Sequence, residues 1–311
     1  MAMQRSTILA GPAIIQMSSQ SIYTSDAVKV VTTFERRQVE SAIYGKLGQR
    51  VTDIKTEITF TPDGMWTSGL LAVLFPWTNP TNGTSMFTAA DVPVTVWGVD
   101  GLKQAYAAGA VTKMPDIILS AGKPTFGSMT ITCIGKDNTA WSDAAKRVTT
   151  SSATFNDATF SLASIKSSTF TAAFTGGSSP WDSFKSKDGF TFSSNVNTQP
   201  VMTDDEGLVD LRIAGVEWSC KFAPVGITVA QIHTRMGIQG AGAARGMSPT
   251  AADLVITGAA SGDPLVTLKN AVMVAAPQHY GYDDLRHGEV ECVSTRPTGS
   301  TALVTITSVG T

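Results

Sequence analysis

The sequence contains an internal repeat, which becomes visible when the chain is shifted by 162 residues so that Phe60 falls on Phe222. In this register Phe60-Thr-Pro-Asp-Gly64 lies over Phe222-Ala-Pro-Val-Gly226, and Thr88-Ala-Ala-Asp91 lies over Thr250-Ala-Ala-Asp253. Single identities keep the same offset, namely Asp26 with Asp188, Gly45 with Gly207 and Arg50 with Arg212. A register held over so long a stretch indicates two copies of one fold.

The repeated residues are of the kinds that end strands and make turns. A proline cannot donate to a β-ladder, so the Phe-x-Pro-x-Gly pattern ends a strand, and its glycine permits the turn that follows. Residues 51–60 lead into this pattern and alternate apolar with polar side chains, as a half-buried antiparallel strand does. Further strands are predicted over 92–99, 128–134, 209–222, 254–257, 265–274 and 302–309.

These segments predict a mainly β fold, because they are rich in Val, Ile, Thr and Phe and are separated by turn-forming residues. The expected architecture is two tandem β-sandwich or small-barrel domains, each with a long hairpin and a short flanking helix. We place the first domain over 1–150, a Ser/Thr/Gly-rich linker or arm over 151–180, and the second domain over 181–311. Short helices are predicted over 100–110, capped by Asp100, and over 142–147, capped by Ser142.

No residue pattern predicts a catalytic, cofactor or metal site. None of the three histidines is paired at a metal-ligand spacing, and the three cysteines are too dispersed for a zinc site or a disulfide framework. Asp204-Asp-Glu206 is interpreted as a solvated acidic turn rather than a metal site. The glycine-rich stretch 237–246 lacks the Gly-Lys-Ser/Thr ending of a phosphate loop. We therefore expect a protein that is not an enzyme and that uses no cofactor.

Charge distinguishes the two copies more than any other property. The whole chain has a net charge of −2, which argues against a general nucleic-acid binder. Segment 35–50 has a net charge of +2, whereas its counterpart 197–212 has a net charge of −3. Both segments are expected to be hairpin arms or loops. Either they are solvated loops that diverged, or their opposite charges pair copy one of a subunit with copy two of its neighbour.

The second interpretation gives ten candidates for contacts between subunits. They are the charged residues of the two arms apart from Arg212: Glu35, Arg36, Arg37, Glu40, Lys46, Arg50, Asp204, Asp205, Glu206 and Asp210.

Several motifs of the first copy resemble the tail tube proteins, or major tail proteins, of long-tailed bacteriophages. The motifs that carry this resemblance are Gly11-Pro-Ala13, Phe60-Thr-Pro-Asp-Gly64, Gly83-Thr-Ser-Met-Phe87 with Asp91-Val-Pro-Val-Thr-Val96, and Met114-Pro-Asp-Ile-Ile-Leu-Ser120 leading to Phe126-Gly-Ser-Met-Thr-Ile-Thr132. They cover most of copy one and, more faintly, copy two.

The resemblance implies a structural protein of the virion tail, synthesised in the cytoplasm of the bacterial host. Rings of such subunits stack into a hollow tube through which double-stranded DNA passes, and hairpins join neighbouring subunits. A duplicated chain would need three copies, rather than six, for a pseudo-sixfold ring. The implied partners are the chain itself and the tape measure, tail-tip and terminator proteins, with no membrane. The alternatives are a tail-tip or baseplate-hub protein, a non-viral ligand-binding β-sandwich and, more remotely, a hydrolase.

Overall fold

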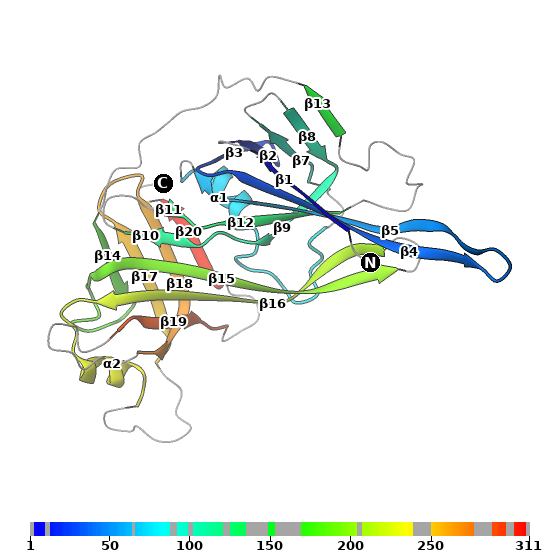
Figure 1. Ribbon diagram of the computed structural model, residues 1–311. Coiled ribbons are helices and arrows are strands. Elements are labelled where there is room, and N and C mark those ends of the chain that lie inside the picture. Colours follow the sequence, from blue (N-terminus) through cyan, green and yellow to red (C-terminus); the bar gives the residue numbers. More distant parts are fainter. Residues whose placement is uncertain are drawn as a thin grey trace.

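The computed structural model describes residues 3–9, 13–63, 66–87, 92–98, 102–120, 125–134, 149–152, 169–203, 207–238, 250–276, 288–296 and 302–308. Within these ranges the chain is mainly β, with antiparallel strands in three sheets and two short helices (Figure 1). The described strands form a sandwich-like arrangement of open sheets. They close no barrel, so the small-barrel alternative is wrong for this part of the chain.

The first half of the chain contributes two sheets. The long hairpin of this half lies in a five-stranded sheet with the order β1 (Met3–Leu9), β4 (Val28–Ser41), β5 (Gly45–Phe60), β12 (Met129–Ile134) and β9 (Ala108–Lys113). A six-stranded sheet has the order β13 (Thr149–Ser152), β8 (Leu102–Tyr106), β7 (Val94–Trp97), β2 (Ile14–Met17), β3 (Gln20–Thr24) and β6 (Pro62–Asp63).

The second half is built on a nine-stranded sheet. Its order is β11 (Thr125–Phe126), β10 (Ile117–Leu119), β15 (Ser186–Thr203), β16 (Gly207–Pro224), β19 (Val290–Ser294), β18 (Pro264–Ala275), β17 (Ala252–Gly258) and β14 (Phe170–Phe174), with β20 (Val304–Ser308) paired to β18. Strands β10 and β11 come from the first half, and β10 pairs with β15. One sheet therefore includes strands from both sides of the predicted boundary at 151–180, and the domain limits themselves stay a prediction.

The strands that alternation predicts are present. Strand β5 contains the predicted segment 51–60, and β16 contains 209–222. The helix predicted over 100–110 is wrong, because β8 and β9 occupy that range and pair with β7 and β12. Its alanines favour a helix locally, but sheet pairing overrides that preference. A Cβ at Gly109 would collide with the Val94 side chain, which is why this strand needs a glycine. The helix predicted over 142–147 lies outside the described residues.

Two other segments form the helices, α1 (Ser68–Leu74) and α2 (Val229–Arg235). Each follows the second strand of a long hairpin and begins after a threonine. Thr67 accepts a hydrogen bond from the backbone N–H of Leu70, while Thr228 forms a capping box with Gln231. Neither helix is long and apolar enough to span a membrane, a statement that covers only the part of the chain described here.

The internal repeat is visible in the register of the two long hairpins. Hairpin β4–β5 has irregularities between Glu35 and Arg36 and between Val39 and Glu40. Hairpin β15–β16 has them between Asn197 and Thr198 and between Val201 and Met202. Both pairs are separated by the 162-residue offset of the sequence repeat. β-Bulges tend to be kept within families because they re-aim and twist a strand, so two shared bulges support a duplicated hairpin.

Pairing beyond the hairpins repeats as well. Strand β5 pairs with β12, which pairs with β9, just as β16 pairs with β19, which pairs with β18. Strand β7 lies between β2 and β8, just as β17 lies between β14 and β18. The continuous strand β18 takes the places of both β8 and β9. For this reason the second half has one sheet where the first half has two.

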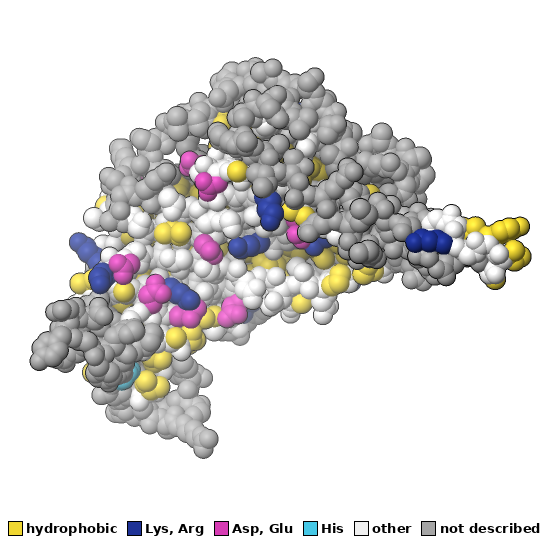
Figure 2. All heavy atoms as spheres, in the orientation of Figure 1, with side chains coloured by type: hydrophobic (Ala, Val, Ile, Leu, Met, Phe, Trp, Pro, Cys, Tyr) yellow, Lys and Arg dark blue, Asp and Glu magenta, His cyan; other side chains and the backbone are white. Residues whose placement is uncertain are grey.

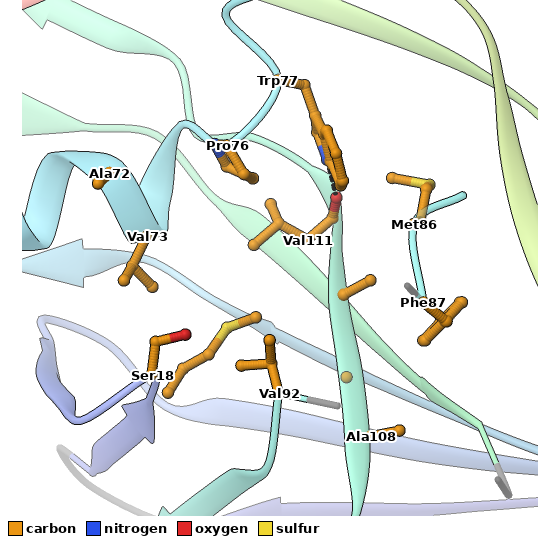
Figure 3. A pocket seen from close by; sticks show the side chains of 13 residues that line it. Ser18, Ala72, Val73, Pro76, Trp77, Met86, Phe87, Val92, Ala108 and Val111 are labelled. Atoms are coloured by element: carbon orange, nitrogen blue, oxygen red, sulfur yellow. Dashed lines mark hydrogen bonds between the residues drawn. The ribbon is translucent and has the colours of Figure 1, made fainter. Parts of the chain in front are cut away.

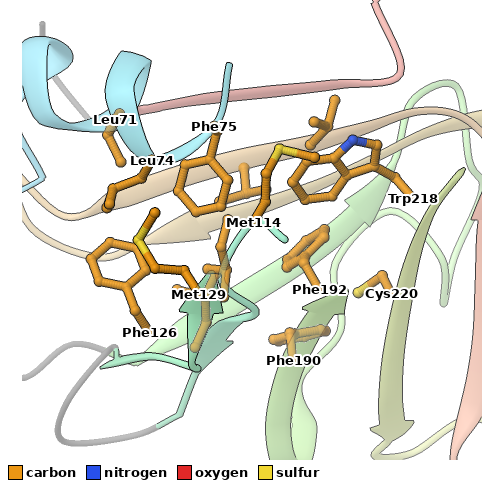
Figure 4. Packing of buried hydrophobic residues seen from close by; sticks show 14 of the residues in the cluster. Leu71, Leu74, Phe75, Met114, Phe126, Met129, Phe190, Phe192, Trp218 and Cys220 are labelled. Carbon is orange, nitrogen blue, oxygen red and sulfur yellow. The ribbon is translucent and has the colours of Figure 1, made fainter. Parts of the chain in front are cut away.

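Both halves contribute side chains to the main hydrophobic core. Helix α1 points Leu71 and Leu74 toward Met129 and Phe126 of the first half, and the next residue, Phe75, reaches toward the second (Figure 4). The ring centroids of Phe75 and Trp218 are 6.0 Å apart. Apolar burial contributes on the order of 25 cal/mol per Å², so a shared core couples the stability of the two halves.

Candidate functional site

The two long hairpins carry the candidate contact residues. In Figure 1 the β4–β5 hairpin extends beyond the rest of the fold to a free end, and the β15–β16 hairpin runs alongside its base. The backbones of Glu35, Arg36, Arg37 and Glu40 lie in β4, those of Lys46 and Arg50 in β5, and that of Asp210 in β16. Of these seven, the structure describes the side chains of Lys46 and Asp210. Residues 204–206, with Asp204, Asp205 and Glu206, lie outside the described residues.

Strand register sets the charge pattern along the β4–β5 arm. Arg37 pairs with Arg50, whereas Glu40 pairs with Lys46. Residues directly opposite on neighbouring strands are close, and like charges in such a pair are unfavourable. The arm therefore has an excess of positive charge at the Arg37–Arg50 position, which an acidic partner would offset. At the matching position of β15–β16, Gln199 pairs with Arg212.

The free end of the β4–β5 hairpin is apolar. Ile43 is 82% exposed, Tyr44 78% and Leu47 58%. Hydrophobic side chains gather at this end in Figure 2, beyond a basic side chain of the arm. Exposed large apolar groups clustered at one place typically mark an interaction site. Sequence reasoning missed these residues. The available signal was an apolar pair placed directly before Gly45, whose φ of 66° marks a turn.

Asp210 is engaged within the chain. Its Oδ1 accepts hydrogen bonds from Ser85 Oγ at 2.8 Å and from Phe87 N at 3.4 Å, and its Oδ2 lies 3.8 Å from Arg212 Nε. The carboxylate thus fixes the connection that follows α1 against β16. Its predicted role in contacts between subunits remains a prediction, and these contacts orient it toward the first half of its own chain.

Backbone hydrogen bonds extend this attachment. Gly83 N donates to Ile213 O at 2.7 Å, Ile213 N donates to Thr84 O at 2.9 Å, and Met86 N donates to Leu211 O at 2.8 Å. Segment 83–86 therefore covers the edge of β16 that β15 leaves open, in the manner of a short added strand. This contact joins the two copies and is specified mainly by backbone geometry.

An apolar pocket of about 310 Å³ lies between α1, β9 and the connection that carries Met86 and Phe87 (Figure 3). Trp77 borders it and donates from Nε1 to the carbonyl oxygen of Val111 at 2.6 Å. Val73, Pro76, Met86, Phe87 and Val92 also line it. Its size is at the lower end of the range for small-molecule sites, and its lining holds no acid–base pair.

The titratable groups of the core do not form a reactive site. All three cysteines are buried and free, and burial raises the pKa of Cys292 to about 12 and that of Cys220 well above its usual value. Their neutral thiols are poor nucleophiles and metal ligands. Across the described part of the chain, no three His, Cys, Asp or Glu residues are grouped so as to hold a metal ion.

Comparison with known proteins assigns no family. No protein-family model matches the chain, and a search of curated proteins finds no match either.

Proposed function

We propose that this protein is a structural subunit that assembles with copies of itself into stacked rings, forming the hollow tail tube of a bacteriophage. The observation that carries the proposal is the duplicated hairpin with the same two bulges in each copy. Duplication within one chain creates two nearly equivalent surfaces. If copy two of one chain can contact copy one of the next, the contact repeats without limit or closes into a ring.

The hairpin arms support alternation of the two copies. Arm 35–50 has a net charge of +2 and arm 197–212 a net charge of −3, and Arg37 pairs directly with Arg50 in the positive arm. A contact between two first copies would bring like charges together, whereas a contact between unlike copies brings opposite charges together. If the two copies alternate around a ring, each chain supplies two neighbouring domains. Three chains then supply six domains.

The exposed apolar end of the β4–β5 hairpin also favours assembly. Burial against a neighbour would remove the exposed apolar surface of Ile43, Tyr44 and Leu47 from water, which is favourable. In a tube, the same subunits would surround a channel for double-stranded DNA, and the tape measure, tail-tip and terminator proteins would contact the tube at its core and ends. The protein would then reside in the virion tail after synthesis in the bacterial cytoplasm.

Sedimentation velocity over a range of protein concentrations tests the proposal. A tube subunit forms species of three times the 32.6 kDa chain mass and then grows without an upper limit. A tail-tip or hub component stops at one closed ring. A 32.6 kDa monomer that persists at high concentration contradicts assembly altogether.

The apolar pocket beside Trp77 favours a second candidate, a β-sandwich that binds a small apolar ligand. This candidate predicts that the chain remains a monomer at high concentration and that a small apolar probe quenches Trp77 fluorescence. A Trp77→Phe variant, which removes this fluorophore, identifies the signal.

A further inference from the structure

Two of the three cysteines lie opposite each other in the nine-stranded sheet, although they are far apart in sequence. Cys220 of β16 pairs with Cys292 of β19 in antiparallel register, and the pairs on both sides of them keep this register without a bulge. Residues that are directly opposite in such a ladder have their side chains on the same face of the sheet. The two thiol side chains are therefore neighbours across the two strands.

The backbone spacing of this pair permits a disulfide. Opposite residues of antiparallel strands have their Cα atoms about 4.5 Å apart in a non-hydrogen-bonded pair and about 5.5 Å apart in a hydrogen-bonded pair. Both values lie within the roughly 4.4–6.8 Å that a disulfide spans. The Cβ atoms of opposite residues are about 4.5–5.5 Å apart and those of a disulfide about 3.5–4.5 Å, so closure needs only a small approach of the two strands.

The cysteine pair belongs to the main core. Both side chains are fully buried, and Phe192 pairs with Cys220 across the other edge of β16 (Figure 4). Burial is the largest cause that raises the pKa of Cys220, and the charge of an ionised Cys292 raises it further. A charge acts in this way on a second group that is close to it. The third cysteine, Cys133, lies in β12 of the five-stranded sheet.

We propose that Cys220 and Cys292 are a site of disulfide modification, which joins β16 to β19 when the chain meets a disulfide oxidant such as glutathione disulfide. Both thiols are free in the structure, as they would be in a chain kept in a reducing compartment. The crosslink would form once the chain leaves that compartment, and it would tie the second strand of the β15–β16 hairpin to its neighbour in the sheet. The inference does not rest on the proposed function.

The modification consists of two thiol–disulfide exchanges. The Cys292 thiol loses its proton and its sulfur attacks glutathione disulfide, which releases one glutathione that takes up a proton. The Cys220 thiol then loses its proton and attacks the Cys292 sulfur of the mixed disulfide, which releases the second glutathione. Two protein thiols are oxidised, and one glutathione disulfide is reduced to two molecules of glutathione. Because the thiols are buried, the reaction follows transient opening of the fold.

Arg235 of α2 favours Cys292 as the first of the two sulfurs to react. Burial raises the pKa of Cys292 to about 12, while the positive charge of Arg235 acts to lower it. The guanidinium lies 3.9 Å from the ring centroid of Phe174, and its Nη2 atom is buried with no hydrogen-bond partner among the described residues. A thiolate at Cys292 would place a compensating negative charge near this group.

Peptide mapping of the parent chain by mass spectrometry tests the pairing. The chain is equilibrated with reduced and oxidised glutathione at a denaturant concentration below its unfolding transition, where the fold still opens transiently. We expect the Cys220–Cys292 disulfide, with Cys133 free, to exceed the other two pairings by about tenfold or more, because the folded strands hold only this pair at disulfide spacing. In full denaturant all three pairings should form, because loop length then sets their ratio.

Three results of the mapping would overturn the inference. The first is the same mixture of pairings below the transition and in full denaturant. The second is three free thiols below the transition at a glutathione ratio that crosslinks the unfolded chain. The third is mixed disulfides with glutathione that do not close.

Two single variants provide a matched comparison. Oxidation should raise the denaturant midpoint of the parent chain, because a crosslink restricts the unfolded state. Cys133→Ala should keep both the crosslink and this rise, whereas Cys220→Ala should lose both. An equal rise in Cys220→Ala would contradict the inference, since it would come from a different pair. If Cys220→Ala does not fold, the peptide map of the parent chain still decides.

Discussion

Phe75 and Trp218 are buried against each other with 6.0 Å between their ring centroids, although one follows the first helix and the other lies in the hairpin of the second copy. This pair, together with the β10–β15 strand pairing, joins the two copies, and we expect them to unfold as one unit. The two similar halves of the repeat therefore share their main core, and the β4–β5 hairpin extends beyond it.

Truncation of Phe75 tests this coupling. Phe75→Ala leaves a cavity at the junction of the halves and should cost about 3–5 kcal/mol of unfolding free energy. Because the core is shared, unfolding should remain a single transition at a lower denaturant midpoint, with probes in both halves coinciding. Phe75→Leu, which retains most of the volume, should lose less. Two separated transitions in the parent or in either variant would show that the halves are independent.

The apolar end of the β4–β5 hairpin should matter for association and not for folding. Replacing Ile43 and Tyr44 by serine removes exposed groups, so the unfolding free energy should change by less than about 0.5 kcal/mol. Self-association measured by light scattering should nevertheless require several-fold more protein. Val225→Ser, at another exposed apolar position outside the hairpin ends, is the control and should leave association unchanged. If Val225→Ser weakened self-association and the replacement of Ile43 and Tyr44 did not, the contact surface would lie elsewhere.

Reversing the charge of the acidic arm tests whether the two copies alternate around the ring. Changing Asp204, Asp205 and Glu206 to lysine should impair ring closure at low salt, and less so at high salt, where screening weakens both attraction and repulsion. Adding Arg36→Glu and Arg37→Glu to the same chain exchanges both signs and should restore closure. Normal rings from the lysine variant would refute charge pairing.

Acid stability should depend on Asp253. Partial burial is the largest influence on its carboxyl and acts to raise the pKa. Hydrogen bonds from Lys269 Nζ at 2.8 Å and Asn270 N at 2.9 Å, together with the lysine charge, outweigh burial and lower the pKa below its usual value. A depressed folded-state pKa means that this group stabilises the fold above the unfolded pKa of about 3.9 and loses that contribution as pH falls through the folded pKa.

Asp253→Asn should therefore be less stable than the parent at neutral pH, and the difference should shrink as the pH is lowered through the acid range. Asp182→Asn, which makes the same substitution at an exposed position, is the control for the change of side chain. Chemical denaturation at a series of pH values measures the effect. A constant difference between Asp253→Asn and the parent down to the lowest pH would show that ionisation of Asp253 does not contribute.

The buried thiols should resist modification. Burial raises the pKa of Cys292 to about 12, and Cys220 lies opposite it across the β16–β19 pairing with its pKa raised as well. Few thiolates exist at neutral pH, so a thiol-specific reagent should react at a rate limited by unfolding and reach three thiols only in denaturant. Rapid labelling of one cysteine in the folded protein would indicate an accessible site.

Local pattern predicted the strands well, because alternation and strand-ending prolines act through neighbours in sequence. The sequence did not indicate the bulges of the two long hairpins, which became visible only in the strand register, where they keep the 162-residue offset. Local sequence pattern did not predict which strands pair with one another. A helix was predicted over 100–110, but pairing with β7 and β12 places residues 102–106 and 108–110 in strands. The bond from Ser85 to Asp210 is equally invisible, because 125 residues separate its ends.

Electron microscopy of the purified chain in negative stain, at increasing protein concentration, tests the central claim most directly. Assembly through two unlike copies predicts rings with pseudo-sixfold symmetry at low concentration and long hollow tubes of stacked rings at high concentration. Monodisperse single particles of the size of one chain, at every concentration, would contradict it.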